Sequence, residues 1–306
     1  SAQAMWRQLS VQKNMNKLLF PLSSKSIAFV QQSAERSNGE QSPQYPFLLC
    51  ALMSLIVRIL AIIATQSYLR VTGGRDQETN LEIVKILRRP TDNQWLRLAT
   101  MLFGATQKSA KEAEGQEELH QLVDDLISML KQPALVSDEE VDAYHIFNLS
   151  GSGKRQQIRT VGDLLKFVLR FRNELIHAHP LTDEHISGAG IAMMRVLQAL
   201  LPLTTYQLRT RIGEQGWQMS GRYPKMVDDS AKGMEDRALV IYKGEAAILT
   251  LSPLMCLAQD IENIDEEQDI FFINAGSLQK LQYIGFVCSE HFDGHNLGTY
   301  EQFKTY

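Results

Sequence analysis

The chain has 306 residues, of which 44% are hydrophobic and 22% are charged, and its formal net charge is −4. This ordinary soluble globular composition is enough for one large domain or two modest ones, and we favour two. The three cysteines lie far apart and match neither a CxxC spacing nor a mixed Cys/His spacing. The sequence therefore argues against a disulfide framework and a cysteine-ligated zinc centre, and a reducing cytoplasm is expected.

One long apolar stretch raises the question of a membrane span. Residues 47–64 are almost all apolar, with Ser54 and Arg58 as interruptions. An arginine near the middle of a bilayer costs about 2.5 kcal/mol or more, and about 18 residues is close to the shortest spanning length. The pattern favours a buried bundle helix that continues to about Leu69 and stops near Gly73-Gly74, with a membrane span as the alternative.

Further helices are predicted by apolar residues that recur at helical spacing. Residues 81–88 form the first, which Pro90 closes, and a second begins at Thr91 or Asp92 as its cap. A third covers 117–130. The apolar stripes predicted for these three helices, in order, are Leu81, Val84 and Leu87; Trp95, Leu98, Leu102 and Phe103; and Leu119, Leu122, Val123, Leu126 and Leu130.

The last third of the chain changes from helical spacing to alternating spacing. Strands are predicted at 207–212, 238–242, 247–251, 270–273 and 281–284. Lys243-Gly244-Glu245 and Asn274-Ala275-Gly276-Ser277 are candidate hairpin turns. The predicted fold class is therefore α+β, with a helical domain over residues 1–205 and a small antiparallel β module over residues 206–306.

Three segments that invite a binding-site interpretation have simpler explanations. Residues 150–155 resemble a phosphate-binding loop, but position 148 is Asn and position 155 is Arg, where a Walker A loop needs Gly and Ser or Thr. The acidic run within 260–269 lacks any calcium-loop spacing and is expected to be a solvated connection. The cluster of His291, Asp293 and His295 is expected to lie in a glycine-containing turn. We predict no metal and no cofactor.

The most informative feature is the segment Arg172-Asn173-Glu174-Leu175-Ile176-His177, near the end of a predicted helix. That helix starts at Val161-Gly162-Asp163 and must end before Pro180, because proline disfavours a helical conformation in the residue before it. Its predicted apolar stripe consists of Leu164, Leu165, Val168, Leu169, Leu175 and Ile176. Arg172 and His177 are separated by about 140° around an ideal helix, so they cannot share one buried stripe. We expect Arg172 to meet a cleft, a partner helix or solvent, while the negative end of the helix favours protonation of His177.

The order of an arginine, a polar residue, three further residues and a histidine resembles the RX4–6H signature of HEPN domains. These are small helical bundles, many of which are endoribonucleases in defence and toxin systems. The resemblance implies a HEPN-like bundle over 1–205, metal-independent RNA cleavage and a composite cleft where the motif helices of two subunits meet. It also implies that His177 acts as general acid or base, that Arg172 holds the phosphate oxygens, and that Asn173 orients the histidine or the phosphate.

Two features of the context fit this resemblance. Another helix is predicted after the motif, from about Thr182 to Leu201. Between Gly151 and Arg211 the chain also holds nine basic residues against four acidic ones, which would guide a polyanion to this region. The basic residues are Lys154, Arg155, Arg159, Lys166, Arg170, Arg172, Arg195, Arg209 and Arg211.

Two functional hypotheses follow. In the first, the chain is a cytoplasmic endoribonuclease that forms a homodimer and binds RNA, with no association with a membrane. A regulatory, antitoxin or activator protein would control it. In the second, the bundle is a non-catalytic interaction or sensor module of a defence or signalling assembly, and Arg172 and His177 are structural. Aromatic residues of the β module could stack on RNA bases, but at alternate strand positions they more often belong to a core.

Overall fold

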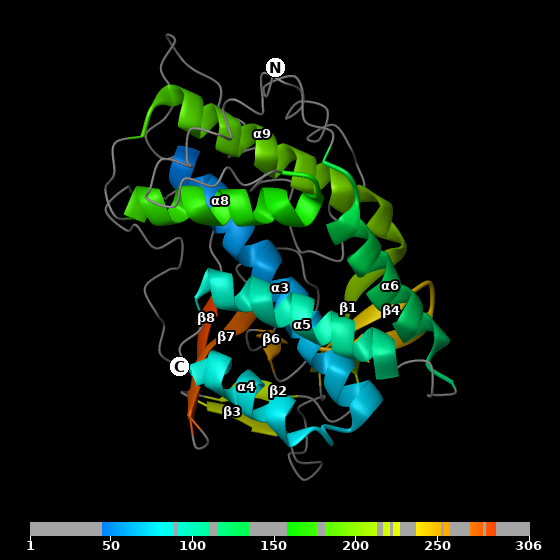
Figure 1. The fold of residues 1–306 in the computed structure, drawn as a ribbon. Coiled ribbons are helices and arrows are strands. Elements are labelled where there is room, and N and C mark those ends of the chain that lie inside the picture. The colour runs from blue at the N-terminus through cyan, green and yellow to red at the C-terminus, as the bar shows by residue number, and fades with distance from the viewer. Residues whose placement is uncertain are drawn as a thin grey trace.

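The fold was obtained as a computed structural model, which describes residues 45–88, 91–109, 115–134, 158–176, 181–212, 217–220, 223–226, 237–251, 254–257, 270–277 and 280–285. Within these ranges, helices are followed by strands, so the fold class is α+β as predicted (Figure 1). The helices are α3 (Tyr45–Thr72), α4 (Gln77–Arg88), α5 (Asp92–Ser109), α6 (Glu117–Lys131), α8 (Val161–Ile176), α9 (Asp183–Leu200) and the 3-10 helix η4 (Leu201–Thr205). The strands are β1 (Tyr206–Ile212), β2 (Trp217–Ser220), β3 (Tyr223–Met226), β4 (Arg237–Lys243), β5 (Ala246–Thr250), β6 (Met255–Leu257), β7 (Ile270–Ser277) and β8 (Lys280–Gly285).

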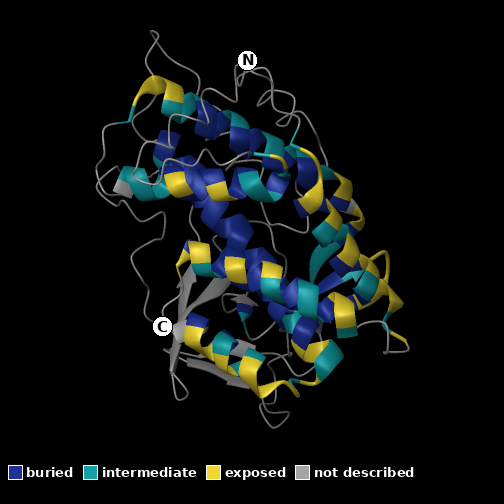
Figure 2. Cartoon of the chain, viewed as in Figure 1, coloured by how far each residue is buried: buried dark blue, intermediate teal, exposed yellow. Residues whose placement is uncertain are grey.

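Helix α3 is the central helix of the fold. It contacts α5, α6, α8, α9 and β5, and Figure 2 shows it buried along most of its length. Glycines end it as predicted, because Gly73 and Gly74 adopt positive φ angles of 62° and 66°.

Two helical segments, α3 and residues 183–203, are long and apolar enough to cross a membrane by length and composition. In α3, however, 94% of the most apolar stretch is buried inside the protein, against 61% in the second segment. A helix that is apolar on all sides and covered by other elements forms the core of a bundle. The arrangement is compatible with a soluble protein.

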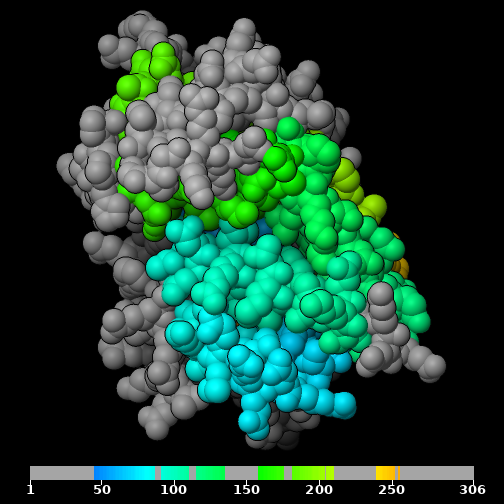
Figure 3. Space-filling model, viewed as in Figure 1, coloured from blue at the N-terminus to red at the C-terminus, as the bar shows by residue number. Residues whose placement is uncertain are grey.

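Helix α4 turns a different face inward from the one that its sequence spacing predicts. Leu81 and Val84 are 70% and 37% exposed, whereas Ile83 and Ile86 are buried. A short helix with apolar residues on more than one side can bury either set, and α4 packs against α5 and β7 with the isoleucines inward. The predicted stripe of α4 is therefore wrong at Leu81 and Val84. In the space-filling view α4, α5 and α6 form adjoining bands of one face (Figure 3).

The other helices bury the predicted residues. All five predicted apolar positions of α6 are buried, as are the four that begin the stripe of α8, while Leu175 near its end is partly buried. Helix α8 also buries Phe167 and Phe171, which the predicted stripe omitted. Helix α9 follows the predicted bounds and packs against α8 and α3.

Three of the strands form an antiparallel sheet in the order β1-β4-β5. Strand β1 pairs with β4 from Tyr206 opposite Lys243 to Ile212 opposite Arg237. Strands β4 and β5 are joined by the predicted hairpin turn, where Gly244 has a φ of 60°. Strands β2 and β3 form a separate pair, and β6-β7-β8 form a second three-stranded sheet.

The second predicted hairpin turn is wrong. Asn274-Ala275-Gly276-Ser277 belongs to strand β7, which pairs with β8 as far as Ser277 opposite Lys280. The register shifts between Ile273 and Ala275, so a bulge accommodates the extra residue and lets the strand continue. The chain reverses only after Ser277.

The first sheet and the helices share one apolar core. Four residues of β4 and β5 join the cluster that the helices form, namely Leu239, Ile241, Ile248 and Leu249. Polar contacts strengthen this interface: the Tyr206 hydroxyl donates to Asp125 of α6 at 2.6 Å, and the Gln66 amide of α3 donates to the Leu251 carbonyl at 3.2 Å. The division into domains 1–205 and 206–306 stays a prediction, although η4 gives way to β1 at that position.

Candidate functional site

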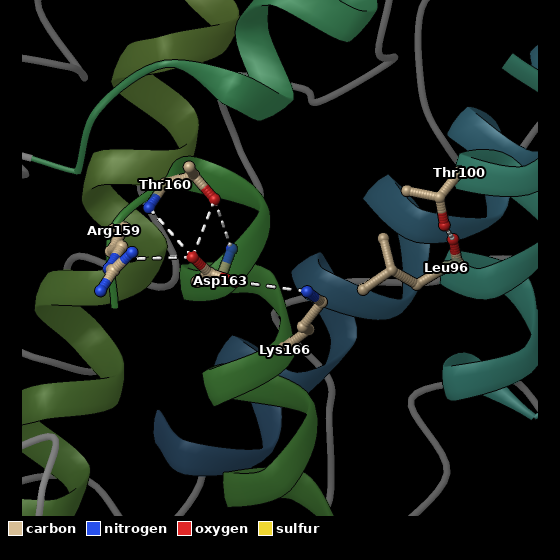
Figure 4. Close-up of polar contacts among 6 residues, drawn as sticks. All are labelled: Leu96, Thr100, Arg159, Thr160, Asp163 and Lys166. Carbon is tan, nitrogen blue, oxygen red and sulfur yellow. Dashed lines mark hydrogen bonds and ion pairs between the residues drawn. The ribbon is translucent and has the colours of Figure 1, made fainter. Parts of the chain in front are cut away.

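The helix that carries the motif, α8, is fixed at its first turn. The Asp163 carboxylate accepts hydrogen bonds from the backbone N–H groups of Arg159 at 3.2 Å and Thr160 at 3.1 Å, and the Asp163 N–H donates to the Thr160 hydroxyl at 3.3 Å (Figure 4). Burial alone would raise the pKa of Asp163, but these bonds and nearby Lys166 outweigh burial and lower it. This capping box fixes where α8 begins and therefore which way its later residues point.

The guanidinium of Arg172 reaches the start of α5. Its Nε lies 2.8 Å from Oδ2 of Asp92, and the side chains are 31% and 4% exposed respectively. The carboxylate is thus inside the protein, while the guanidinium extends from the core to the surface. Because an ionised carboxylate is costly to bury without a counter-charge, Arg172 stabilises the charge of Asp92. The partner helix expected for Arg172 is α5 of the same chain.

Asp92 is held from two further sides. The Ser54 hydroxyl of α3 donates to the same Oδ2 at 2.6 Å. Thr91 acts as the cap of α5, because its hydroxyl accepts from the Gln94 N–H at 3.3 Å and its own N–H donates to the Gln94 side chain at 2.8 Å. Asp92 therefore lies in the first turn of α5, where the helix end favours a negative charge, and its side chain points inward.

The contact to Ser54 belongs to a polar line on α3. Cys50, Ser54 and Arg58 follow at intervals of four residues, so they lie on one side of the helix. Burial raises the pKa of the Cys50 thiol, an effect that Arg172 opposes and Asp92 reinforces. A buried thiol with a raised pKa is unreactive, so Cys50 is a packing residue here.

The other end of this line holds a second arginine. Arg58 is only 6% exposed, and its Cζ lies 5.8 Å from the centroid of the Trp95 ring, which is itself buried. Trp95 follows Asp92 by one turn on α5, so α5 presents first a carboxylate and then a ring to α3. We name the following set the polar seam: Cys50, Ser54 and Arg58 of α3, Asp92 and Trp95 of α5, and Arg172 of α8.

The predicted site residues are described in part. Arg172 has the position given above, and Asn173 and Glu174 are half-buried beside it on α8. His177 and His179 lie outside the described residues, so the geometry between Arg172 and His177 stays a prediction. Sequence reasoning missed Asp92 as the partner of Arg172, although the Thr91–Gln94 capping pattern could have indicated that its side chain was free to point inward.

The first turn of the next helix, α9, contains His185, whose ring takes part in the cap. The Thr182 N–H donates to Nδ1 of His185 at 2.9 Å, and the His185 N–H donates to the Thr182 hydroxyl at 3.4 Å. Burial lowers the pKa of His185, while Glu184 and Glu174 act in the opposite direction without cancelling it. Since an accepting Nδ1 carries no proton, this cap needs a neutral imidazole.

The predicted basic surplus is partly paired within the fold. Lys166 lies 3.2 Å from Asp163, and Arg209 lies 3.4 Å from Glu245 and stacks 5.2 Å from the Tyr242 ring centroid. Arg170 is exposed on α8. Lys154 and Arg155, together with the 150–155 loop and the cluster at 291–295, fall in segments that are not described.

Among the residues that the structure describes, no three His, Cys, Asp or Glu side chains gather in a way that could hold a metal ion. The polar groups that meet at the described site are the guanidinium of Arg172, the carboxylate of Asp92 and the hydroxyl of Ser54.

Comparison of the chain with protein family models, with curated proteins and with solved structures gave no match.

Proposed function

We propose that the protein is a metal-independent endoribonuclease of a defence or toxin-type system, with Arg172, Asn173 and His177 as its catalytic residues. The observation that carries this proposal is the ion pair at the end of α8. A guanidinium that a buried carboxylate holds through Nε, with 31% of its side chain exposed, is a fixed cation that a phosphate can approach. The HEPN-like spacing supplies the imidazole five residues later.

The reaction needs a base, an acid and a counter-charge. The ribose 2′-hydroxyl attacks the adjacent phosphorus as His177 removes its proton, the bond from phosphorus to the 5′-oxygen breaks, and that oxygen gains a proton. The products are a 2′,3′-cyclic phosphate and a 5′-hydroxyl. Arg172 neutralises the charge on the phosphate oxygens through its terminal N–H groups, and Asn173 orients the phosphate or His177.

The same resemblance supports a homodimer in which two copies of α8 face each other and form one composite cleft. A cytoplasmic enzyme of this kind would need restraint, either from a regulatory partner or from an inactive resting arrangement. Light scattering coupled to size exclusion gives the subunit number, and a monomer at all concentrations would remove the composite cleft.

The test is cleavage of total RNA and tRNA in EDTA, followed by analysis of the product ends. His177→Ala is the most direct variant. Arg172→Ala would also leave buried Asp92 without its counter-charge, so Arg172→Lys is the better arginine variant and Arg170→Ala is the matched surface control. Cleavage to cyclic phosphate ends by the wild type and Arg170→Ala, with at least 100-fold loss in His177→Ala, is the expected result. Equal cleavage by His177→Ala would overturn the assignment.

A second function is favoured by the same ion pair. Because Arg172 already neutralises Asp92, its presence can be explained by folding alone, and the bundle would then be a non-catalytic interaction or sensor module of a defence or signalling assembly. In that case no preparation cleaves RNA, and Arg172→Lys changes stability while His177→Ala changes little.

A further inference from the structure

Asp92 lies outside the motif, yet it determines the direction of the motif arginine. We propose that Asp92 is a positioning residue of the phosphate site: with Ser54 it holds Arg172 so that the terminal nitrogens of the guanidinium face a phosphodiester. This inference rests on the proposed function, and it adds a residue from α5 and one from α3 to a site so far assigned to α8.

The carboxylate is suited to this task because it cannot easily move. Three restraints act on Asp92: the capped first turn of α5, the 2.6 Å hydrogen bond from Ser54, and its own burial at 4% exposure. An arginine side chain is long and flexible, and a fixed partner reduces the number of conformations that it samples. A cation held in one place stabilises developing charge without reorganising during the reaction.

The geometry of the contact leaves the binding edge of Arg172 available. The closest approach uses Nε, and within the described part of the chain no hydrogen bond joins the terminal nitrogens of Arg172 to another residue. Arg58 gives the contrast on the same seam, since it is 6% exposed and stacks over Trp95. A guanidinium that served packing alone would be expected to be covered in the same way, whereas that of Arg172 reaches the surface.

The experiment compares Asp92→Asn and Ser54→Ala in the full chain with two controls. Asp92→Asn removes the charge but keeps the shape, and Ser54→Ala removes one restraint. Leu102→Ala creates a cavity in the same helix α5, about 15 Å farther along its axis, and so destabilises the fold without touching Arg172. Arg170→Ala removes an exposed cation from α8. All variants are measured well below their unfolding temperatures.

The first arm measures kcat and KM for RNA cleavage in EDTA. Asp92→Asn should lower kcat at least tenfold and raise KM about fivefold, because the phosphate is held less well. Ser54→Ala should lower kcat about two- to fivefold, and Leu102→Ala should retain the wild-type kcat and KM. Asp92→Asn with a kcat within twofold of wild type overturns the positioning role and leaves the ribonuclease assignment standing.

The second arm measures binding of a 2′-O-methyl RNA oligonucleotide, which cannot undergo 2′-hydroxyl attack, by fluorescence anisotropy. If the wild type cleaves no RNA, the proposed function fails, and this arm decides the positioning role alone. At least fivefold weaker binding by Asp92→Asn, with Leu102→Ala close to wild type and a clearly smaller loss in Arg170→Ala, supports it. Equal binding by Asp92→Asn and wild type, or an equal loss in Leu102→Ala, overturns it.

Discussion

The two faces of α3 are specific for their partners in different ways. Toward α5 and α8, α3 presents the polar seam, in which Ser54 and Arg172 both contact Asp92. Toward α9, the start of α3 packs so closely that a Cβ on Gly190 would overlap the Tyr45 hydroxyl. The first contact depends on charge and hydrogen bonding, and the second depends on the small volume of Gly190. Both kinds of contact fix the position of α8, which packs against both α3 and α9.

The difference matters for the site because charged contacts and close-packed contacts respond differently to substitution. A close-packed contact fails when volume is added, whereas a buried ion pair fails when one partner is removed. Variants on the two faces should therefore separate these modes.

The largest expected effect is the removal of the cation from the polar seam. Arg172→Ala should lower the free energy of unfolding by about 3 kcal/mol, because it leaves Asp92 buried without a counter-charge. Chemical denaturation monitored by circular dichroism gives this value. Arg170→Ala, on the same helix but exposed, should change it by less than about 0.5 kcal/mol, and equal effects of both variants would contradict the ion pair.

The contact between α3 and α9 is tested by adding one methyl group at Gly190. Gly190→Ala should destabilise the fold by about 1–3 kcal/mol, since the added Cβ overlaps the Tyr45 hydroxyl. Gly104→Ala is the matched control in the interior of α5, where a Cβ would meet nothing within 4 Å. It should be stabilising by up to about 1 kcal/mol, because alanine is the better helix former. A Gly190→Ala protein as stable as the wild type would mean that α3 and α9 do not approach so closely.

The far end of the polar seam should be less sensitive than the end at Arg172. Arg58→Met keeps the length of the side chain and its packing against Trp95, so the expected loss is below about 1.5 kcal/mol. The comparison with Arg172→Ala in one denaturant series sharpens the contrast. If Arg58→Met lowered the free energy of unfolding more than Arg172→Ala, Arg58 and not Arg172 would be the arginine on which stability depends more.

The smallest expected effect concerns pH at the start of α9. Burial lowers the pKa of His185 below its unfolded value of about 6.5, so the stability from its neutral form is fully present above that pH and is lost as the pH falls through the folded pKa. His185→Gln keeps an acceptor at this cap position without titrating. Between pH 7.5 and 5.5 the wild type should therefore lose slightly more stability than the variant, by under about 1 kcal/mol in melting experiments.

Much of the fold is predictable from local patterns, while the site depends on distant contacts. The spacing in α6 and α8 and the alternation in β4 and β5 each act within a few residues, so one sequence is enough to find them. The buried face of helix α4 could not be predicted in the same way, because α4 has apolar residues on two sides and its neighbours determine which of them are buried. The turn predicted at 274–277 failed because a bulge can absorb a glycine-containing segment.

The candidate site follows the same division. The position of Arg172 near the end of α8 was predictable from Pro180 and from helical spacing. Its partner was not, because Asp92 lies far back in the chain and both Thr91 and Asp92 are good cap residues. The Thr91–Gln94 pattern could indicate that Thr91 takes the cap, but only the packing of α5 against α3 and α8 shows that Asp92 meets the arginine.

The buried thiol of the polar seam makes local opening of the protein measurable. Cys50 is 8% exposed, and burial raises its pKa, so a thiol reagent reaches its thiolate only when the interface around this part of α3 opens. In a chain with Cys256→Ser and Cys288→Ser, the labelling rate of Cys50 would report how often this interface opens. An RNA bound at Arg172 would then slow the labelling of a sulfur atom that it never touches.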